Sequence, residues 1–294
     1  MDDTGLRARA IALYDHFTHV SHDRRAFMAD LTRLAGSAAV ANALLLGIAA
    51  DPAAAAIVPP DDKRLNAREI AWPFRHTGRR MKGYWVRPAG TRGPLPAVIV
   101  VHENRGLNAH IRDVARRVAL EGFAVLAPDF LSIAGGTPAD EDKAREMIGA
   151  LDLGTAVADG AGTIRWLKGR RQTTGKVGLV GFCWGGAMVG RLAAASDDAL
   201  AAAVAYYGPA PDPAQAADVK APMLLHYAGL DERVNKTAGP WIAALKAHGV
   251  PVQSFVYEGV NHAFNNDTSA ERYNAAAAKL AWSRTIAFLK QHLA

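Results

Sequence analysis

Residues 176–187 read Lys-Val-Gly-Leu-Val-Gly-Phe-Cys-Trp-Gly-Gly-Ala, and position 183 holds the only cysteine of the chain. The apolar first half of this segment is typical of a buried strand. Gly181 and Gly185 stand two residues on either side of Cys183, where the lack of a Cβ lets a strand and a following helix approach closely. The segment therefore predicts a strand, a sharp turn that presents a thiol nucleophile, and a helix.

A thiol nucleophile needs a base, and the base needs a carboxylate that orients it. Asp231 follows a strand-like run at 222–227, and His262 follows another at 252–257. Loops at the carboxyl ends of parallel strands are where open α/β sheets place their sites. The chain order nucleophile, acid, histidine also suits a nucleophile on a strand-to-helix turn. We therefore predict Cys183 as nucleophile, Asp231 as acid and His262 as base.

Other residues compete for these roles. Asp129 also ends a strand-like run and is the alternative acid, although it precedes the nucleophile in the chain. His226 lies inside an apolar strand, where we expect a hydrogen-bonded core histidine. His16, His19 and His22 form an i, i+3, i+6 series without a cysteine or carboxylate cluster. We expect them to form an exposed helix face, and we predict no metal site.

Strand-like and helical runs alternate along most of the chain. Apolar runs predict strands at 81–87, 97–102, 124–128, 177–182, 202–207, 222–227 and 252–257. Helical patterns lie between and after them, at 110–121, 140–168, 185–196, 236–248 and 269–293. This alternation predicts an α/β fold with a mostly parallel, doubly wound sheet and helices on both faces.

These motifs resemble the dienelactone hydrolase (carboxymethylenebutenolidase) family of the α/β-hydrolase superfamily. The similarity is carried by Gly-Phe-Cys-Trp-Gly-Gly at 181–186, the strand-end Asp231, Asn-His-Ala-Phe at 261–264 and Val-Ile-Val-Val-His-Glu-Asn-Arg-Gly-Leu at 98–107. It covers residues 70–294. The resemblance implies an α/β-hydrolase fold, a Cys-His-Asp catalytic triad and hydrolysis of an ester or lactone without a cofactor.

The resemblance also implies roles for two further residues. Glu103 would contact the cysteine, hold it as a thiol at rest and accept its proton when substrate binds, since a nearby carboxylate disfavours a thiolate. The backbone amide of Asn104 would form an oxyanion hole with that of Trp184. Cys183 would then attack the carbonyl and form an acyl-thioester, which a water activated by His262 would hydrolyse.

The sequence departs from the family pattern after the histidine. Type members bind a substrate carboxylate with an arginine four residues past it, and here that position holds Asn266, whose side-chain amide we expect to bind the substrate by a hydrogen bond but without a charge. Arg105, Arg145 and Arg272 are the other candidate cations for a substrate. The missing arginine favours the alternative of a broad carboxylesterase of the same fold. A non-catalytic binding protein is the third alternative, although it would not need the full set of catalytic residues.

Residues 1–69 form an N-terminal helical extension in this interpretation, and residues 70–294 form the hydrolase domain. Asp-Arg-Arg-Ala-Phe-Met at 23–28, followed by an apolar run at 34–50 and small residues at 53–56, is similar to a twin-arginine export signal. Polar and glycine residues interrupt the run, which is also short for a membrane span. We therefore expect two or three helices that pack on the hydrolase domain or on a second copy in a homo-oligomer. We expect a cytoplasmic protein, with a periplasmic one as the alternative.

Composition narrows the classes of partner. The chain has 294 residues, of which 50% are hydrophobic, enough for a sizeable core. The net charge of +6 comes mostly from residues 1–92 and is not accompanied by an aromatic-interleaved basic motif, so we expect no nucleic-acid partner. We also expect no stable membrane insertion. The single cysteine excludes an internal disulfide and suits a reducing compartment. The expected partner is a small ester or lactone.

Overall fold

The computed structural model describes residues 3–21, 23–49, 51, 54, 56–74 and 79–294. Its centre is an eight-stranded sheet in the order β1-β2-β4-β3-β5-β6-β7-β8. The strands are β1 (Leu65–Pro73), β2 (Arg80–Pro88), β3 (Leu95–Val101), β4 (Ala124–Asp129), β5 (Thr173–Phe182), β6 (Ala202–Tyr206), β7 (Met223–Ala228) and β8 (Val252–Tyr257). Strands β3 to β8 run parallel, whereas β2 pairs antiparallel with β1 and β4. The predicted mostly parallel sheet is confirmed.

Strand β1 was missed in the sequence. It lies at the edge of the sheet and most of its side chains are exposed, so it lacks the apolar run or strict alternation that predicts a strand. Because β1 begins at Leu65, the sheet starts before the boundary that we placed between residues 69 and 70.

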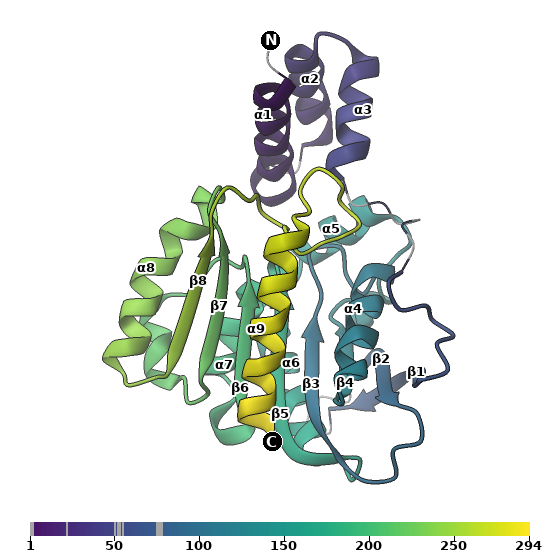
Figure 1. Cartoon of the computed structure of the whole chain (residues 1–294), viewed down its shortest axis with the longest axis vertical. Helices are drawn as coiled ribbons and strands as arrows, with labels where there is room; N and C mark the ends of the chain where they lie inside the picture. The colour runs from purple at the N-terminus through teal and green to yellow at the C-terminus, as the bar shows by residue number, and fades with distance from the viewer. Residues whose placement is uncertain (1–2, 22, 50, 52–53, 55, 75–78) are drawn as a thin grey trace.

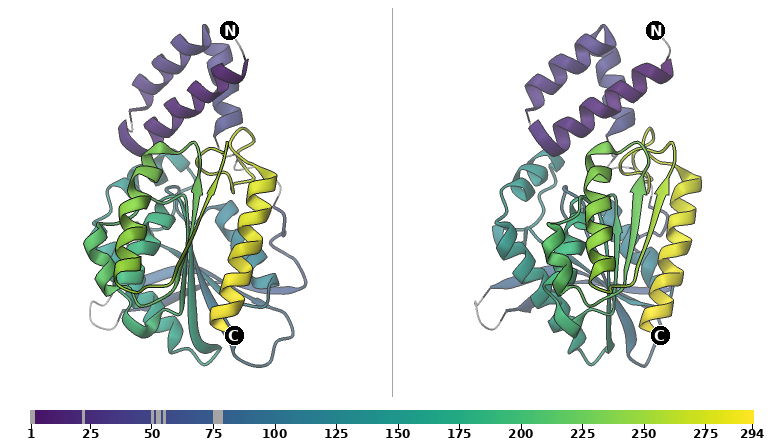
Figure 2. Two further views of the ribbon diagram at one scale, coloured as in Figure 1. Left: turned by 60° about the vertical axis from the view of Figure 1, so that its left-hand side comes forward. Right: turned by 90° about the vertical axis from the view of Figure 1, so that its left-hand side faces the viewer.

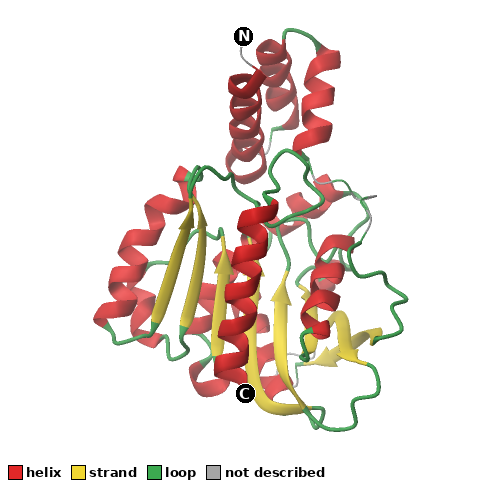
Figure 3. Ribbon diagram, viewed as in Figure 1, coloured by secondary structure: helices red, strands yellow, loops and turns green. Residues whose placement is uncertain are grey.

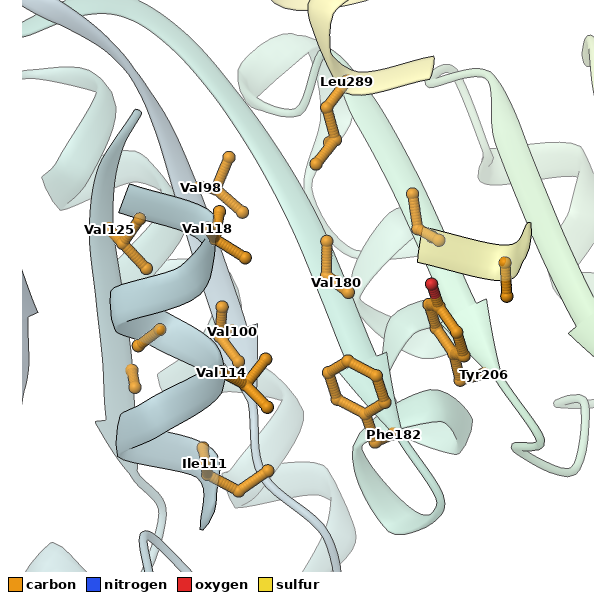
Figure 4. Packing of buried hydrophobic residues seen from close by; sticks show 14 of the residues in the cluster. Val98, Val100, Ile111, Val114, Val118, Val125, Val180, Phe182, Tyr206 and Leu289 are labelled. Atoms are coloured by element: carbon orange, nitrogen blue, oxygen red, sulfur yellow. The ribbon is translucent and has the colours of Figure 1, made fainter. Parts of the chain in front are cut away.

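Helices cover both faces of the sheet (Figures 1 and 3). One face carries α4 (Ala109–Leu120) and α9 (Ala275–Leu293), and the other carries α6 (Leu153–Lys168), α7 (Trp184–Ala194) and α8 (Glu232–Ala247). Figure 4 shows part of the first interface, where valines of β3, β4 and β5 meet α4. Each such side chain contributes about 1.5–3 kcal/mol when it is fully buried.

Three helix predictions needed correction. The helix expected at 236–248 begins at Glu232, directly after its N-cap Asp231. The run at 140–168 contains two helices, α5 (Glu141–Gly149) and α6, because Asp152 caps the start of α6 by accepting a hydrogen bond from the Thr155 amide. The last helix begins at Ala275 rather than at 269, after the N-cap Asn274.

The N-terminal segment forms three helices, α1 (Asp3–His16), α2 (Arg24–Ala35) and α3 (Ala38–Ile48), and a π-helical turn, η1 (Phe17–Ser21). We call these four elements the cap. They share a small apolar cluster of their own that includes Tyr14, Phe27 and Leu31. The cap lies over the end of the sheet toward which the parallel strands point (Figures 1 and 2).

No single described helix is long and apolar enough to cross a membrane. Only α2 and α3 together meet that length and composition, and the pair is bent by 111°. The twin-arginine-like residues begin α2, where Asp23 caps the helix through the amides of Arg25 and Ala26. Parts of the small-residue stretch at 53–56 lie outside the described residues.

Candidate active site

Cys183 sits on the turn between β5 and α7, with φ 54° and ψ −113°. A non-glycine residue with positive φ is strained, which is typical of a nucleophile held at a tight turn. Glycine is required on both sides of Cys183 because a side chain would overlap the backbone there. A Cβ on Gly181 would lie 2.2 Å from the Gly185 carbonyl oxygen, and one on Gly185 would lie 2.4 Å from the Val101 carbonyl oxygen. Trp184 begins α7, so its amide is among those without an acceptor inside the helix.

His262 and Asp231 form a buried pair beside this turn. His262 Nδ1 donates to Asp231 Oδ2 at 2.5 Å, and Asp231 Oδ1 accepts from the Val234 amide at 3.2 Å. A ring nitrogen of His262 lies within 4.8 Å of Cys183 Sγ. Among the residues that the structure describes, the buried Nε2 atom has no hydrogen-bond partner of normal geometry, and it is the ring atom that can accept a proton. The structure thus brings together Cys183, His262 and Asp231.

Electrostatics stabilise the protonated form of His262. Burial lowers the pKa of His262, but negative charge developing on the Cys183 sulfur and the charge and hydrogen bond of the Asp231 carboxylate outweigh it and raise that pKa to about 10. Burial also raises the pKa of Asp231, but the charge and hydrogen bond of His262 lower it below its usual value. The imidazolium that forms when His262 accepts a proton from the thiol is therefore stabilised between the sulfur and Asp231.

The alternative acid and base candidates have other surroundings. Asp129 accepts hydrogen bonds from the Leu131 amide and from the amide and hydroxyl of Thr137, so it shapes a loop. His226 is fully buried between Thr285 and Tyr257, at 3.1 and 2.9 Å from their hydroxyls. Burial and, to a lesser extent, Arg284 lower its pKa to about 3.

Glu103 has different partners from those that the resemblance implied. Its carboxylate accepts a hydrogen bond from Asn266 Nδ2 at 2.8 Å and a longer one from the Tyr207 hydroxyl at 3.5 Å. It lines the same small cavity as Cys183, but no hydrogen bond joins the two residues in the part of the chain that the structure describes. Asn266, expected to face a substrate, holds Glu103 instead.

The residue that does contact the sulfur is His19 of η1, whose Nε2 lies 3.2 Å from Cys183 Sγ. The ring of His19 also packs edge-on against that of His262, with centroids 4.7 Å apart. The expectation of an exposed helix face is wrong for His19, whereas His16 is exposed and His22 lies outside the described residues. The π-helical turn interrupts the regular period on which that expectation rested.

The three candidate arginines all contact the cap. The Arg105 guanidinium donates to the Tyr14 hydroxyl and pairs with Glu141 at 3.2 Å. Arg272 Nη1 lies 3.5 Å from Asp15 Oδ1, and its Nε donates to the Ile48 carbonyl oxygen at 3.0 Å. The Arg145 guanidinium lies over the Phe17 ring, 4.3 Å from its centroid. These cations therefore hold the cap in place.

Two hollows meet at the nucleophile. An inner cavity of about 10 Å³ is bordered by Cys183, His262 and Glu103, and it has room for one water at most. A groove of about 320 Å³ reaches Cys183 and Trp184 from the other side, which is a volume typical of a small-ligand site. Its apolar lining residues are Ile148, Leu151, Leu153, Ala187 and Pro209.

One group of described residues could hold a metal ion. His19, Cys183 and His262 place one ligand atom each within 4.8 Å of the others.

The chain is similar to several known proteins. "Putative carboxymethylenebutenolidase" of Escherichia coli O157:H7 is 34% identical over 259 residues, which covers 83% of this chain and 94% of that protein. A protein of the same name from Methylorubrum extorquens is 31% identical over 291 residues, covering 91% and 98%. The crystal structure titled "Putative Dienelactone Hydrolase" from Klebsiella pneumoniae has a TM-score of 0.69 at 32% identity and covers 77% of this chain and 99% of that one.

A sequence model of the dienelactone hydrolase family matches residues 81–293, which include the turn at Cys183 and both members of the Asp231–His262 pair. The matched part also contains strands β3 to β8 and the helices on both faces of the sheet. With its fold, its strand-end pair and its match to the family model, the chain belongs to the dienelactone hydrolase family.

Proposed function

We propose that this hydrolase cleaves small esters or lactones through an acyl-thioester on Cys183. The observation that carries the proposal is the strained turn that presents the sulfur within 4.8 Å of a ring nitrogen of His262, whose Nδ1 is bound to Asp231. This is the arrangement of an activated nucleophile, its base and the carboxylate that orients the base.

In the first half of the reaction, His262 Nε2 accepts the thiol proton and the sulfur attacks the carbonyl carbon. The amides of Trp184 and Asn104 stabilise the negative charge on the carbonyl oxygen. A carbon–sulfur bond forms, the carbon–oxygen bond to the leaving group breaks, and the imidazolium returns its proton to the leaving alkoxide.

In the second half, His262 accepts a proton from a water that attacks the thioester carbon. The carbon–sulfur bond breaks, the sulfur regains a proton from the imidazolium and the acid leaves. Asp231 stays ionised throughout, since His262 lowers its pKa, and it stabilises the imidazolium in both halves.

Neutral esters are the favoured substrates. Most of the groove that leads to Cys183 has an apolar lining, and Arg105, Arg145 and Arg272 contact cap residues. A neutral acyl group can enter the groove without displacing those contacts, whereas a carboxylate would have to compete with them or reach Arg233, a second arginine on the groove wall beside Arg145. This observation favours the broad carboxylesterase over a hydrolase restricted to anionic lactones.

The test is hydrolysis of short p-nitrophenyl esters and of an anionic lactone, with intact-mass detection of an acyl adduct. We expect Cys183→Ala to reduce hydrolysis to background and His262→Ala to accumulate adduct on Cys183, because deacylation needs the base. His248→Ala, an exposed position after α8, is the matched control. Hydrolysis that persists in Cys183→Ala would refute the nucleophile.

A further inference from the structure

The cap places one side chain inside the active site. His19, Thr18 and Asn104 border both the inner cavity and the groove, and Cys183 lies at their junction. The imidazole of His19 therefore forms part of the wall between the space next to His262 and the space open to a substrate.

The hydrogen bonds of His19 fix its tautomer. Nδ1 lies 2.9 Å from the Asp15 carbonyl oxygen, which can only accept, so Nδ1 carries the proton. The Thr18 hydroxyl, also 2.9 Å from Nδ1, donates its own proton to the Tyr14 carbonyl oxygen. Nε2 is then an unprotonated acceptor that faces Cys183 Sγ at 3.2 Å.

The surroundings keep this imidazole neutral. Burial is the largest cause that lowers the pKa of His19 well below its usual value, and the charge of Arg233 and that of His262 once it is protonated lower it further. A neutral acceptor at this distance stabilises the protonated sulfur, because a thiolate has no proton to donate to it.

The position of η1 is fixed by contacts of the residues that precede His19. Asn104 Nδ2 donates to the Thr18 carbonyl oxygen at 3.2 Å, and the Tyr14 hydroxyl binds Arg105. Asp15 lies against Arg272, and Phe17 packs under Arg145. These contacts place the acceptor at the sulfur without any covalent constraint, so they can be broken and re-formed.

We propose that His19 is a positioning residue that gates Cys183: at rest its Nε2 accepts a hydrogen bond from the thiol, and its ring blocks the junction of groove and inner cavity. This inference rests on the proposed function and gives His19 the resting role that the resemblance assigned to Glu103. Entry of an acyl group displaces the ring, the thiol loses its acceptor, and its proton passes to His262.

The experiment measures alkylation of Cys183 by iodoacetamide at neutral pH, followed by intact mass, in the full chain. The single cysteine makes the product unambiguous. We expect His19→Ala to react about fivefold faster or more, the effect of losing one hydrogen bond of ordinary strength and opening the junction. His16→Ala, at the exposed end of α1 in the same cap, is the matched control and should react like the wild type.

His19→Gln separates the hydrogen bond from a structural effect on the cap, because its amide oxygen can accept a hydrogen bond from the thiol. We expect this variant to react nearly as slowly as the wild type. Equal or slower alkylation of His19→Ala than of the wild type would overturn the proposal, as would equally fast reaction of both His19 variants. Alkylation requires no turnover, so its outcome is independent of whether the ester assays support the proposed hydrolysis.

Discussion

Nε2 of His19 lies 3.2 Å from Sγ of Cys183, although 164 residues separate them in the sequence. The N-terminal cap is therefore part of the active site as well as a cover over the sheet. The reactivity of the sulfur depends on this cap and on the pair formed by His262 and Asp231, and the predictions below separate these contributions.

Asp231→Asn should lower hydrolysis by two orders of magnitude or more while leaving the fold intact. The amide cannot stabilise an imidazolium and favours the wrong tautomer of His262, but its oxygen can still cap α8 through the Val234 amide. Asp231→Ala should lose activity and, in addition, about 1 kcal/mol of stability through the missing cap. Steady-state kinetics and urea unfolding check both effects. Near-normal turnover of Asp231→Asn would contradict the role of this carboxylate.

Glu103→Gln should change the alkylation rate of Cys183 by less than about twofold, which is below the effect of one hydrogen bond. The structure joins Glu103 to Asn266 and Tyr207 rather than to the sulfur. The same iodoacetamide assay, run beside His19→Ala, makes the comparison direct. A larger change in Glu103→Gln than in His19→Ala would show that the carboxylate, and not the imidazole, controls the thiol.

Gly185→Ala should destabilise the protein by about 2 kcal/mol or more, since a Cβ would overlap backbone atoms that cannot move aside cheaply. The overlap is with the carbonyl oxygens of Val101 and His102, at 2.4 and 2.5 Å. Gly149→Ala, at the end of α5 with no atom within 4 Å of the new methyl group, is the control and should be neutral. Thermal unfolding measures the difference, and equal melting temperatures for the two variants would refute the close approach.

His226→Gln should weaken the loss of stability in acid. Because burial lowers the pKa of His226 to about 3 in the folded protein, its contribution is complete above the ordinary value of 6.5 and is lost as pH falls from there toward 3. The wild type should therefore lose more melting temperature between pH 7 and pH 4 than the variant. The measurement is a series of thermal unfolding curves, and parallel curves would contradict a neutral buried imidazole.

The turn at Cys183 and the parallel sheet could be predicted because short stretches of sequence determine them. The apolar run, the glycines and the cysteine at 176–187 encode the turn locally, and the alternation of runs predicts the parallel sheet. The edge strand β1 was not predicted from the sequence because its exposed side chains form no apolar pattern. The break between α5 and α6 was also not predicted, because it depends on a single capping residue, Asp152.

The pairing of His262 with Asp231 was predicted from their places after strands, since strand ends meet at one edge of a parallel sheet. The partners of Glu103 and the position of His19 could not be predicted in this way. A side-chain contact such as that of Glu103 with Asn266 depends on how loops pack after the sheet has formed.

The sequence by itself determined the strand-to-helix turn at Cys183, the order of the strands along the chain and the two residues that follow strands β7 and β8, because glycine spacing and apolar periodicity act within a few residues. Only the tertiary structure decided which side chain meets the sulfur at rest. That choice depends on docking the cap, through Tyr14, Asp15 and Phe17, onto arginines far away in the chain, and such docking leaves no periodic trace in the sequence.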